Sequence, residues 1–294
     1  MKWDSIVPFL FISPWIIGFL AFTLGPLLFS LFISFFDWPV VGEATFVGLD
    51  NYKTMFTEDP LFWKSLWVTV KFAALFVPLN IITALVLAIL LNQNVKGHSF
   101  FRTFFYLPSV ISGVALAMIW AWVYNGEYGI LNYVLSLIGV QGPDWLNDTS
   151  WALLAMVIAS LWGQGTMMLI FLAGLKGIPK ELYEASSIDG AKKLHQFFKI
   201  TLPLLTPTIL FNLITTIITA FQQLTLALLL TGGGPLNSTY FYAMYVYENA
   251  FKYFKMGYSS ANAWFMFLIV LGLSMLVFKS SAAWVYYEGE VKNK

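Results

Sequence analysis

The sequence contains no cysteine, and only 11% of its 294 residues are charged. The absence of cysteine excludes disulfides, zinc–thiolate sites and cysteine nucleophiles. A soluble globular domain carries about 25% charged residues. The small share of charge, together with 59% hydrophobic residues, therefore indicates an integral membrane protein. A net charge of only +1 argues against a nucleic-acid partner.

Further absences limit the chemistry that the chain can perform. No Gly-x-x-x-x-Gly-Lys-Ser/Thr phosphate loop is present, and the glycine-rich run Gly232–Pro235 lacks the lysine, so the chain does not bind ATP through that motif. No pair of carboxylates lies within an apolar run, which counts against a membrane hydrolase and an ion-coupled carrier, since both usually hold ionisable groups at mid-membrane. His98 and His195 each stand alone in predicted loops, where histidine is usually solvated.

Long apolar runs dominate what remains. A helix needs about twenty apolar residues to cross the hydrocarbon core of a bilayer. The first run is too long for the core of a cleavable signal peptide, so we expect it to be a membrane span. We therefore predict an all-α integral membrane fold with six transmembrane helices, at approximately Phe9–Phe36, Trp63–Leu91, Phe104–Tyr124, Trp151–Leu175, Leu205–Thr231 and Ala261–Trp284.

The distribution of lysine and arginine predicts that both termini face the cytoplasm, because cytoplasmic loops carry an excess of these residues. With that orientation, the inner segments hold Lys2, Lys96, Arg102, Lys176, Lys180, Lys192, Lys193, Lys199, Lys279, Lys292 and Lys294, and the outer segments hold Lys53, Lys64, Lys252 and Lys255. The predicted outer loop at 125–150 contains neither lysine nor arginine.

A polar segment of about thirty residues, at 176–204, separates the fourth and fifth predicted spans. A chain reversal alone does not need such a long segment, so we expect a partner to bind it. Glu184, Ala185 and Ser186 are predicted to begin a short helix whose small side chains admit a close neighbour. Gly190 is predicted to end this helix, since glycine adopts the left-handed conformation found at helix ends. Pro203 fits the first turn of the next helix.

This segment resembles a known motif. Glu184-Ala185-Ser186, Asp189-Gly190-Ala191 and Ile200-Thr201-Leu202-Pro203 are similar to the EAA signature of permease subunits in bacterial binding-protein-dependent ABC importers. Ser186 departs from the usual alanine by one hydroxyl group. The segments 46–52, 231–235 and 257–261 also resemble permeases of the carbohydrate branch, which are maltose-type, type I importers.

The resemblance implies a domain organisation and a set of partners. It implies a first helix and extracytoplasmic connector at 1–62, an ABC transmembrane type-1 domain at 63–285 and a cytoplasmic tail at 286–294. The implied partners, in a bacterial inner membrane, are a second permease subunit, two ATPase subunits and an extracytoplasmic sugar-binding protein. ATP and Mg²⁺ would bind to the ATPase subunits, and this chain would hold no cofactor or metal and would not be an enzyme.

The resemblance also implies which residues couple the permease to an ATPase subunit. A helix around Glu184 would fit a groove on the ATPase, and the Glu184 carboxylate would pair with a basic residue there. The implied coupling residues are Glu184, Ala185, Ser186, Ile188, Asp189, Gly190, Ala191 and Pro203.

Polar side chains within the spans mark a candidate substrate pathway. Asn212, Thr216, Thr219 and Gln223 follow a four-three-four spacing and are predicted to share one helical face. Such a stripe suits sugar hydroxyls, and it equally suits hydrogen bonds between helices. The resemblance implies ligand contacts at Trp162, Gly163, Thr166, Thr216, Thr219, Ala220 and Gln223.

Alternatives remain open on the residues alone. Lys71 lies within the second predicted span, where its side chain either extends to the outer interface or borders the pathway. A cation in the pathway would favour glycerol-3-phosphate or another polyol derivative over a neutral sugar. An ion-coupled carrier is the alternative from a different class.

Overall fold

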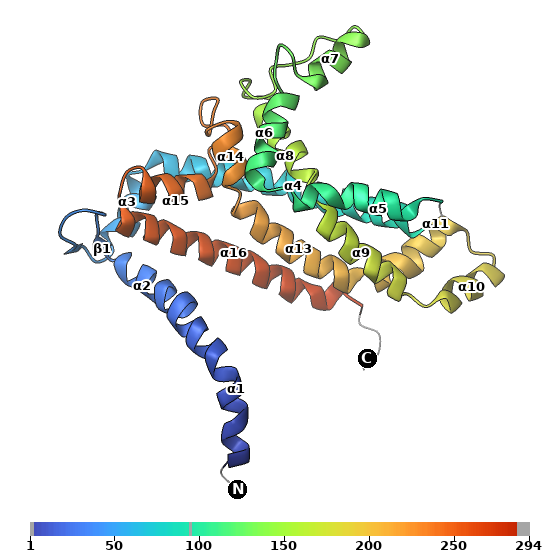
Figure 1. Cartoon of the computed structure of the whole chain (residues 1–294), viewed down its shortest axis with the longest axis horizontal. Coiled ribbons are helices and arrows are strands. Elements are labelled where there is room, and N and C mark those ends of the chain that lie inside the picture. The colour runs from blue at the N-terminus through green and yellow to red at the C-terminus, as the bar shows by residue number, and fades with distance from the viewer. Residues whose placement is uncertain (1–2, 94–95, 287–294) are drawn as a thin grey trace. The chain divides into compact units, whose positions relative to one another are not determined.

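The computed structural model describes residues 3–93 and 96–286, with side chains described from residue 11 onward (Figure 1). Residue contacts divide the chain into two compact units, one of residues 1–63 and 245–268 and the other of residues 64–244 and 269–294. Lys2, Lys292 and Lys294 lie outside the described residues, as does the expected tail beyond Tyr286.

The first unit contains the N-terminal helical segment and the expected outer connector. The elements of this unit are α1 (Trp3–Phe19), the π-helical turn η1 (Leu20–Leu24), α2 (Gly25–Ile33), β1 (Phe36–Asp37), β2 (Thr45–Phe46) and α3 (Asp50–Thr57), followed by the start of α4 (Pro60–Asn92) and parts of α15 (Tyr242–Phe251) and α16 (Met256–Trp284). The strands form an antiparallel hairpin with Phe36 opposite Phe46. The Asn51 side chain donates to the carbonyls of Ser34 and Phe36, at 2.8 and 2.9 Å, and so fixes α3 against the hairpin.

The second unit contains the remaining helices. They are α5 (His98–Tyr106), the 3-10 helix η2 (Leu107–Val110), α6 (Gly113–Val123), α7 (Ile130–Leu137), α8 (Ala152–Leu161), α9 (Gly165–Gly177), α10 (Lys180–Ile188), α11 (Lys193–Gln196), the π-helical turn η3 (Phe197–Thr201), α12 (Leu202–Leu204), α13 (Thr206–Phe221) and α14 (Thr225–Leu230). Its apolar core packs α4 against α9. Ala84 and Ala88 of α4 are fully buried there, and small side chains of this kind let two helices approach closely in a membrane.

Three of the predicted spans are single long apolar helices, at Phe11–Ile33, Pro60–Asn92 and Met256–Trp284. The last begins five residues before the predicted Ala261, because the aromatic and small residues before Ala261 continue the helix. By length and composition, the structure has up to six spans if each bent helix pair counts as one.

The third, fourth and fifth predicted spans are each interrupted in the structure rather than formed by one helix. The bends are 103° between η2 and α6, 50° between α8 and α9, and 64° between α12 and α13. At the first bend, the Ser112 hydroxyl caps α6 by accepting from the Ala115 N–H at 3.3 Å. The fifth span also ends early, since α13 stops at Phe221 and α14 begins only at Thr225, with Gln222 and Gln223 in the break between them.

Candidate functional site

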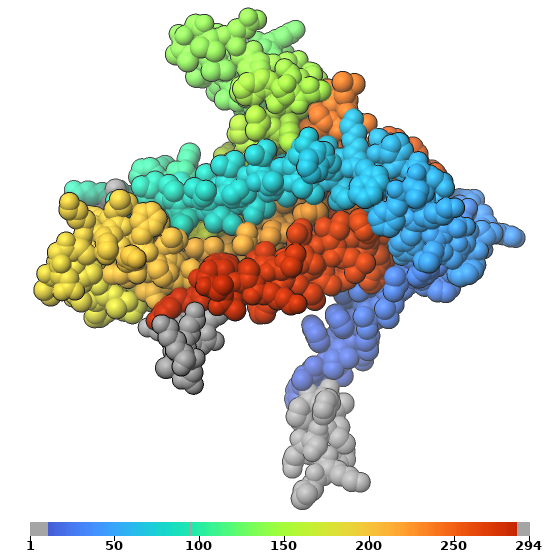
Figure 2. Space-filling view, turned by 180° about the vertical axis from the view of Figure 1, so that it is seen from behind, coloured from blue at the N-terminus to red at the C-terminus, as the bar shows by residue number. Residues whose placement is uncertain are grey.

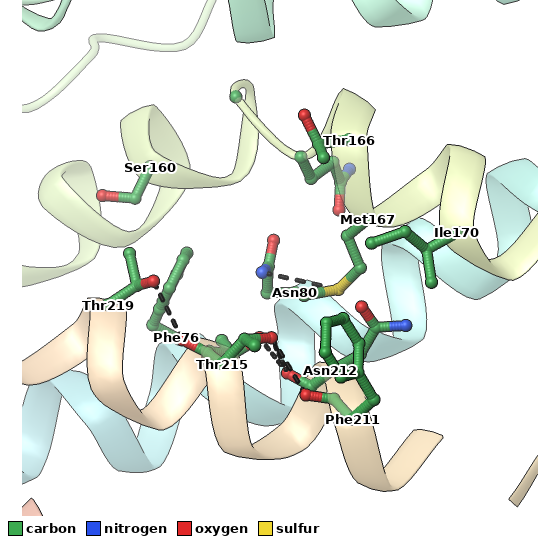
Figure 3. Close-up of a pocket in the computed structure, with 13 residues that line it drawn as sticks. Phe76, Asn80, Ser160, Thr166, Met167, Ile170, Phe211, Asn212, Thr215 and Thr219 are labelled. Atoms are coloured by element: carbon green, nitrogen blue, oxygen red, sulfur yellow. Dashed lines mark hydrogen bonds between the residues drawn. The ribbon is translucent and has the colours of Figure 1, made fainter. Parts of the chain in front are cut away.

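A cavity of about 410 Å³ lies within the second unit, between α4, α8, α9 and α13 (Figure 3). The residues that line it are Phe76, Asn80, Ser160, Gly163, Gln164, Thr166, Met167, Ile170, Phe211, Asn212, Thr215, Thr216 and Thr219. None of these residues is ionisable, so the described wall of the cavity offers amides, hydroxyls and apolar surface, and no charge.

Helix breaks hold polar groups beside this cavity. Between α8 and α9, the Gln164 side chain accepts a hydrogen bond from the Thr83 hydroxyl of α4 at 2.6 Å. Just beyond α13, the Gln223 amide donates to the Ser160 hydroxyl of α8 at 3.0 Å. Non-helical backbone at membrane depth is tolerated where it is buried in protein or lines a water-filled cavity. The two breaks therefore fit a polar cavity at this place in the unit.

Two asparagines in the wall hold buried atoms without a hydrogen-bond partner among the described residues. These atoms are Oδ1 of Asn80 and Nδ2 of Asn212, whose side chains are 6% and 1% exposed. The Asn80 amide nitrogen makes only a long contact with the Met167 sulfur, at 3.7 Å (Figure 3). Leaving a buried polar group unpaired costs about 1–3 kcal/mol. A polar ligand in the cavity would supply the missing partners.

The threonines of α13 donate their hydroxyl protons to the helix itself. Thr216 donates to the Asn212 carbonyl at 2.6 Å, and Thr219 donates to the Thr215 carbonyl at 2.9 Å. A hydroxyl that has donated its proton still has lone pairs with which to accept. These oxygens can therefore accept hydrogen bonds from a ligand that carries donors, such as the hydroxyl groups of a sugar.

The expected pathway residues are divided between the cavity wall and its surroundings. Gly163, Thr166, Thr216 and Thr219 line the cavity, whereas Trp162, Ala220 and Gln223 do not. The Trp162 ring packs edge-on against Trp120, with centroids 5.9 Å apart, and Ala220 is buried. The prediction that Gln223 continues the helical face of α13 was wrong, because that helix ends two residues earlier.

Sequence reasoning missed the contribution of α4 to this site. Phe76 and Asn80 line the cavity from the second predicted span, which was read only as an apolar run with one lysine. Asn80 is an amide in the middle of that span, two residues after Pro78, and a buried amide in an apolar helix is itself a signal.

The EAA segment contains a helix that starts earlier than predicted. Helix α10 begins at Lys180, directly after Pro179, so Glu184–Ser186 lie in its middle rather than at its start. Proline fixes its own φ and restricts the residue before it, which makes Pro179 a natural boundary. Asp189 ends the helix, and Gly190 follows with φ +79°, which confirms the predicted left-handed position.

The coupling residues lie mostly on an open surface of the second unit, in the yellow part of Figure 2. Glu184, Ala185, Asp189 and Gly190 are exposed, and Ile188 is 87% exposed. Within the described residues, the Glu184 carboxylate has no ion pair. The exposed acid and the exposed apolar side chain are both available to a partner.

The remaining residues of this set lie against the next helical segment. Ser186 and Ala191 are half-buried. Pro203 is the second residue of α12, as expected for the first turn of a helix. The helical path already starts at Lys193, however, because α11 and η3 run directly into α12.

Lys71 lies outside the cavity wall. Its side chain is on an exposed face of α4, and its ammonium lies 5.4 Å from the centre of the Trp67 ring, one helical turn earlier. The aromatic face stabilises the cation at this position.

Comparison with known proteins agrees with these features. Residues 80–287 match the family described as binding-protein-dependent transport system inner membrane component. The chain is 45% identical to the probable ABC transporter permease protein YesP of Bacillus subtilis (strain 168), over 98% of this chain and 94% of that protein. It is 36% identical to the trehalose/maltose transport system permease protein MalF of Thermococcus litoralis, over 94% of each chain.

A solved structure shares the fold. A chain of a bacterial ABC transporter involved in the import of the acidic polysaccharide alginate superposes with a TM-score of 0.84 at 23% identity, covering 96% of this chain and 98% of that one. The type I importer fold expected from the sequence is therefore supported by structure as well as by motif. The chain belongs to the family of inner membrane components of binding-protein-dependent transport systems, and it is a transporter subunit rather than an enzyme.

Proposed function

We propose that this chain forms half of the translocation pathway of an ATP-driven importer for mono- or oligosaccharides, in a bacterial inner membrane with both termini in the cytoplasm. The cavity carries this proposal, because its wall consists of amides, hydroxyls and two aromatic rings without an ionisable side chain among the residues that line it. Hydroxyl-rich neutral solutes need hydrogen-bond partners and no counter-charge. The trehalose/maltose permease among its relatives points to the same class of substrate.

The two unpaired amide atoms make the proposal specific. Asn212 presents a buried N–H donor and Asn80 a buried carbonyl acceptor, from α13 and α4 respectively. A sugar hydroxyl donates and accepts at once, so it can satisfy either group. We infer that these asparagines, with Gly163, Thr166, Thr216 and Thr219, contact the passing solute. Trp162, Ala220 and Gln223 act around this wall, with Gln223 holding Ser160 in place.

Energy for import comes from partner subunits in this proposal. The chain carries no phosphate loop, so ATP and Mg²⁺ bind to two ATPase subunits. The exposed surface of α10 docks into one of these subunits, and the Glu184 carboxylate pairs with a basic residue of the ATPase. A second permease subunit completes the pathway, and an extracytoplasmic binding protein delivers the sugar.

The cavity disfavours the two alternatives raised by the sequence. A phosphate ester needs basic groups in its path, and no lysine or arginine is among the described residues that line the cavity. A proton- or sodium-coupled carrier uses carboxylates at mid-membrane, and the part of the cavity wall that the structure describes contains no carboxylate either.

Uptake by the assembled transporter tests the proposal. Asn80→Leu and Asn212→Leu keep the approximate size of each side chain and remove its amide. We expect uptake of a transported sugar into proteoliposomes to fall by about tenfold or more, since one lost hydrogen bond to a buried group costs about 1.4 kcal/mol or more. The melting temperature should stay unchanged or rise, because each variant removes an unpaired buried group.

Asn92→Leu is the matched control, since Asn92 lies on the same helix and outside the cavity wall. Uptake in this variant should equal that of the wild type. Normal uptake in both cavity variants would overturn the assignment of the cavity. Sugar uptake that persists without ATP would overturn the proposed energy source.

A further inference from the structure

Gln196 of α11 connects the EAA helix to the segment that follows it. Its side-chain nitrogen lies 2.9 Å from the Ser186 hydroxyl, 2.9 Å from the Ser187 hydroxyl and 3.2 Å from the Tyr183 carbonyl. All three acceptors belong to α10, and the Gln196 side chain is half-buried. One amide group therefore joins α11 to α10 across the turn at 189–192, called the Gly190 turn below.

The directions of these hydrogen bonds are consistent with one another. Ser186 and Ser187 both donate their hydroxyl protons to the Tyr183 carbonyl, at 2.9 and 2.7 Å. Each serine oxygen is then left with lone pairs only. A hydrogen-bond donor is required opposite them, and the amide nitrogen of Gln196 supplies it. A carboxylate of the same shape could not.

A second bond joins the same two segments. The Tyr183 hydroxyl lies 2.9 Å from the Thr201 hydroxyl, and Thr201 is the last residue of η3. From η3 the chain continues through α12 into α13, which contributes Asn212, Thr216 and Thr219 to the cavity wall. The helix with the exposed Glu184 is thus tied at two points to the chain that leads to the cavity.

The Gly190 turn explains why such ties matter. Gly190 has φ +79°, and nothing lies within 4 Å of the position where a side chain would begin. The turn is closed by backbone hydrogen bonds from the Gly190 N–H to the Ser187 carbonyl, at 3.1 Å, and from the Ala191 N–H to the Ser186 carbonyl, at 2.9 Å. Glycine brings no side chain to this turn, so the bonds of Gln196 and Tyr183 supply the side-chain contacts that hold α10 against the segment that follows.

We propose that Gln196 is a positioning residue for transport. It clamps α10 to the α11–η3 segment, so that a displacement of α10 is transmitted to the cavity-lining helix α13 and is not absorbed by backbone rotation at Gly190. This inference rests on the proposed coupling function of α10. It adds a residue outside the EAA signature, which acts through Ser186 and Ser187 and touches neither sugar nor nucleotide.

The test measures ATP hydrolysis and sugar uptake separately in the reconstituted transporter. Gln196→Leu and Gln196→Glu both remove the donor, and Gln196→Glu keeps the shape of the side chain. We expect the ATP hydrolysed per sugar imported to rise about fivefold or more in both variants, since coupling free energies of 1–3 kcal/mol correspond to factors of that size. Gln196→Lys restores a donor at this position, and the ratio should return toward that of the wild type.

A second measurement keeps the inference falsifiable if Gln196→Leu assembles poorly. The pair Ser186→Ala and Ser187→Ala removes the acceptors instead, and it should raise the same ratio. Adding Gln196→Leu to that pair should raise it no further, because both changes break one interaction. Additive effects, or an equal loss of hydrolysis and uptake in every variant, would overturn the clamp.

The control is Gln141→Leu, which removes an exposed amide from the predicted outer loop and should leave both rates unchanged. Failure of the wider proposal is distinguishable from failure of the clamp. A wild-type transporter that shows no ATP-driven sugar uptake contradicts the proposed function. A wild-type transporter that works, with variants that couple normally, contradicts only the clamp.

Discussion

The Asp59 carboxylate accepts a hydrogen bond from the Tyr245 hydroxyl at 2.6 Å, although the two residues are separated by 186 positions in the chain. The same oxygen accepts from the Tyr258 hydroxyl at 3.1 Å, and the other oxygen accepts from the Leu61 N–H at 2.9 Å. Burial raises the pKa of the Tyr245 phenol, and the hydrogen bond to Asp59 raises it further. Tyr245 therefore stays protonated and remains a donor.

Tyr245→Phe should destabilise the first unit, because it removes a donor to a charged oxygen and leaves the packing of the ring intact. Hydrogen bonds to charged groups contribute about 1.5–3 kcal/mol, and the free energy of unfolding should fall by about that amount. The change is measured as a shift of the melting temperature of the purified transporter, followed by tryptophan fluorescence.

Tyr247→Phe serves as the control for that variant. Tyr247 lies on the same helix, is 36% exposed and packs its ring on Phe251, which phenylalanine can replace. Equal melting temperatures for the two variants would show that the Asp59 bond contributes nothing to stability.

Gly190→Trp should abolish sugar uptake while the subunit still inserts and assembles. Glycine at φ +79° is replaced by a residue that finds this conformation costly, by about 1–2 kcal/mol. The bulky ring would also stand on the surface that we assign to the ATPase. Uptake and ATPase co-purification are the measurements, and robust uptake would count against the coupling function of this segment.

Gly139→Trp separates backbone strain from docking. Gly139 has φ +75° and is equally open, with nothing within 4 Å, but it follows α7 in the predicted outer loop. Both variants carry the same strain, so uptake should be lost only in Gly190→Trp. Loss of uptake in both would assign the effect to the backbone.

Lys71→Met should leave uptake equal to that of the wild type. Lys71 lies outside the cavity wall, over the Trp67 ring, about 16 Å along α4 from Pro60 at 1.5 Å per residue. Its long side chain can extend part of that distance toward the outer interface. A clear fall in uptake, with normal amounts of assembled transporter, would instead place Lys71 beside the pathway.

Gly165→Ala should destabilise the second unit. A methyl group at Gly165 would lie 2.7 Å from the Tyr106 Cα and 2.9 Å from the Phe105 carbonyl oxygen, and backbone atoms of α5 cannot move aside cheaply. Overpacking of this kind costs about 1–3 kcal/mol, measurable as a lower melting temperature. Gly163→Ala is the matched control, because its nearest neighbour lies 3.9 Å away and stability should not change.

The sequence alone predicted the features that depend on composition. The spans at the N-terminus, at α4 and at α16 follow from long apolar runs, and the Gly190 turn follows from the motif. The breaks in the other spans were missed, because hydropathy averaged over about twenty residues stays high even where glycine and glutamine interrupt the helix, as at Gly163 and Gln164. Local hydropathy does not reveal where backbone leaves the helix to line a cavity.

The sequence alone also did not predict which side chains from other segments would contact the residues of the stripe and of the motif. Asn80 was overlooked because it belongs to a different span from the polar stripe of α13, and only the fold brings the two together. Ser186 was read as a minor departure from the signature, yet its hydroxyl accepts from Gln196. The bond joins residues ten positions apart across a turn, and no helical or strand periodicity links such a pair.

The uncharged wall of the cavity has a consequence for energetics across the bilayer. Moving one elementary charge through a membrane potential involves about 2.3 kcal/mol per 100 mV. The described residues of this wall carry no formal charge, so their rearrangement around a neutral solute displaces none through the electric field. If the neutral solute of the proposed function passes along this wall, its passage displaces no charge there, and we expect depolarisation of the cell neither to speed nor to slow uptake.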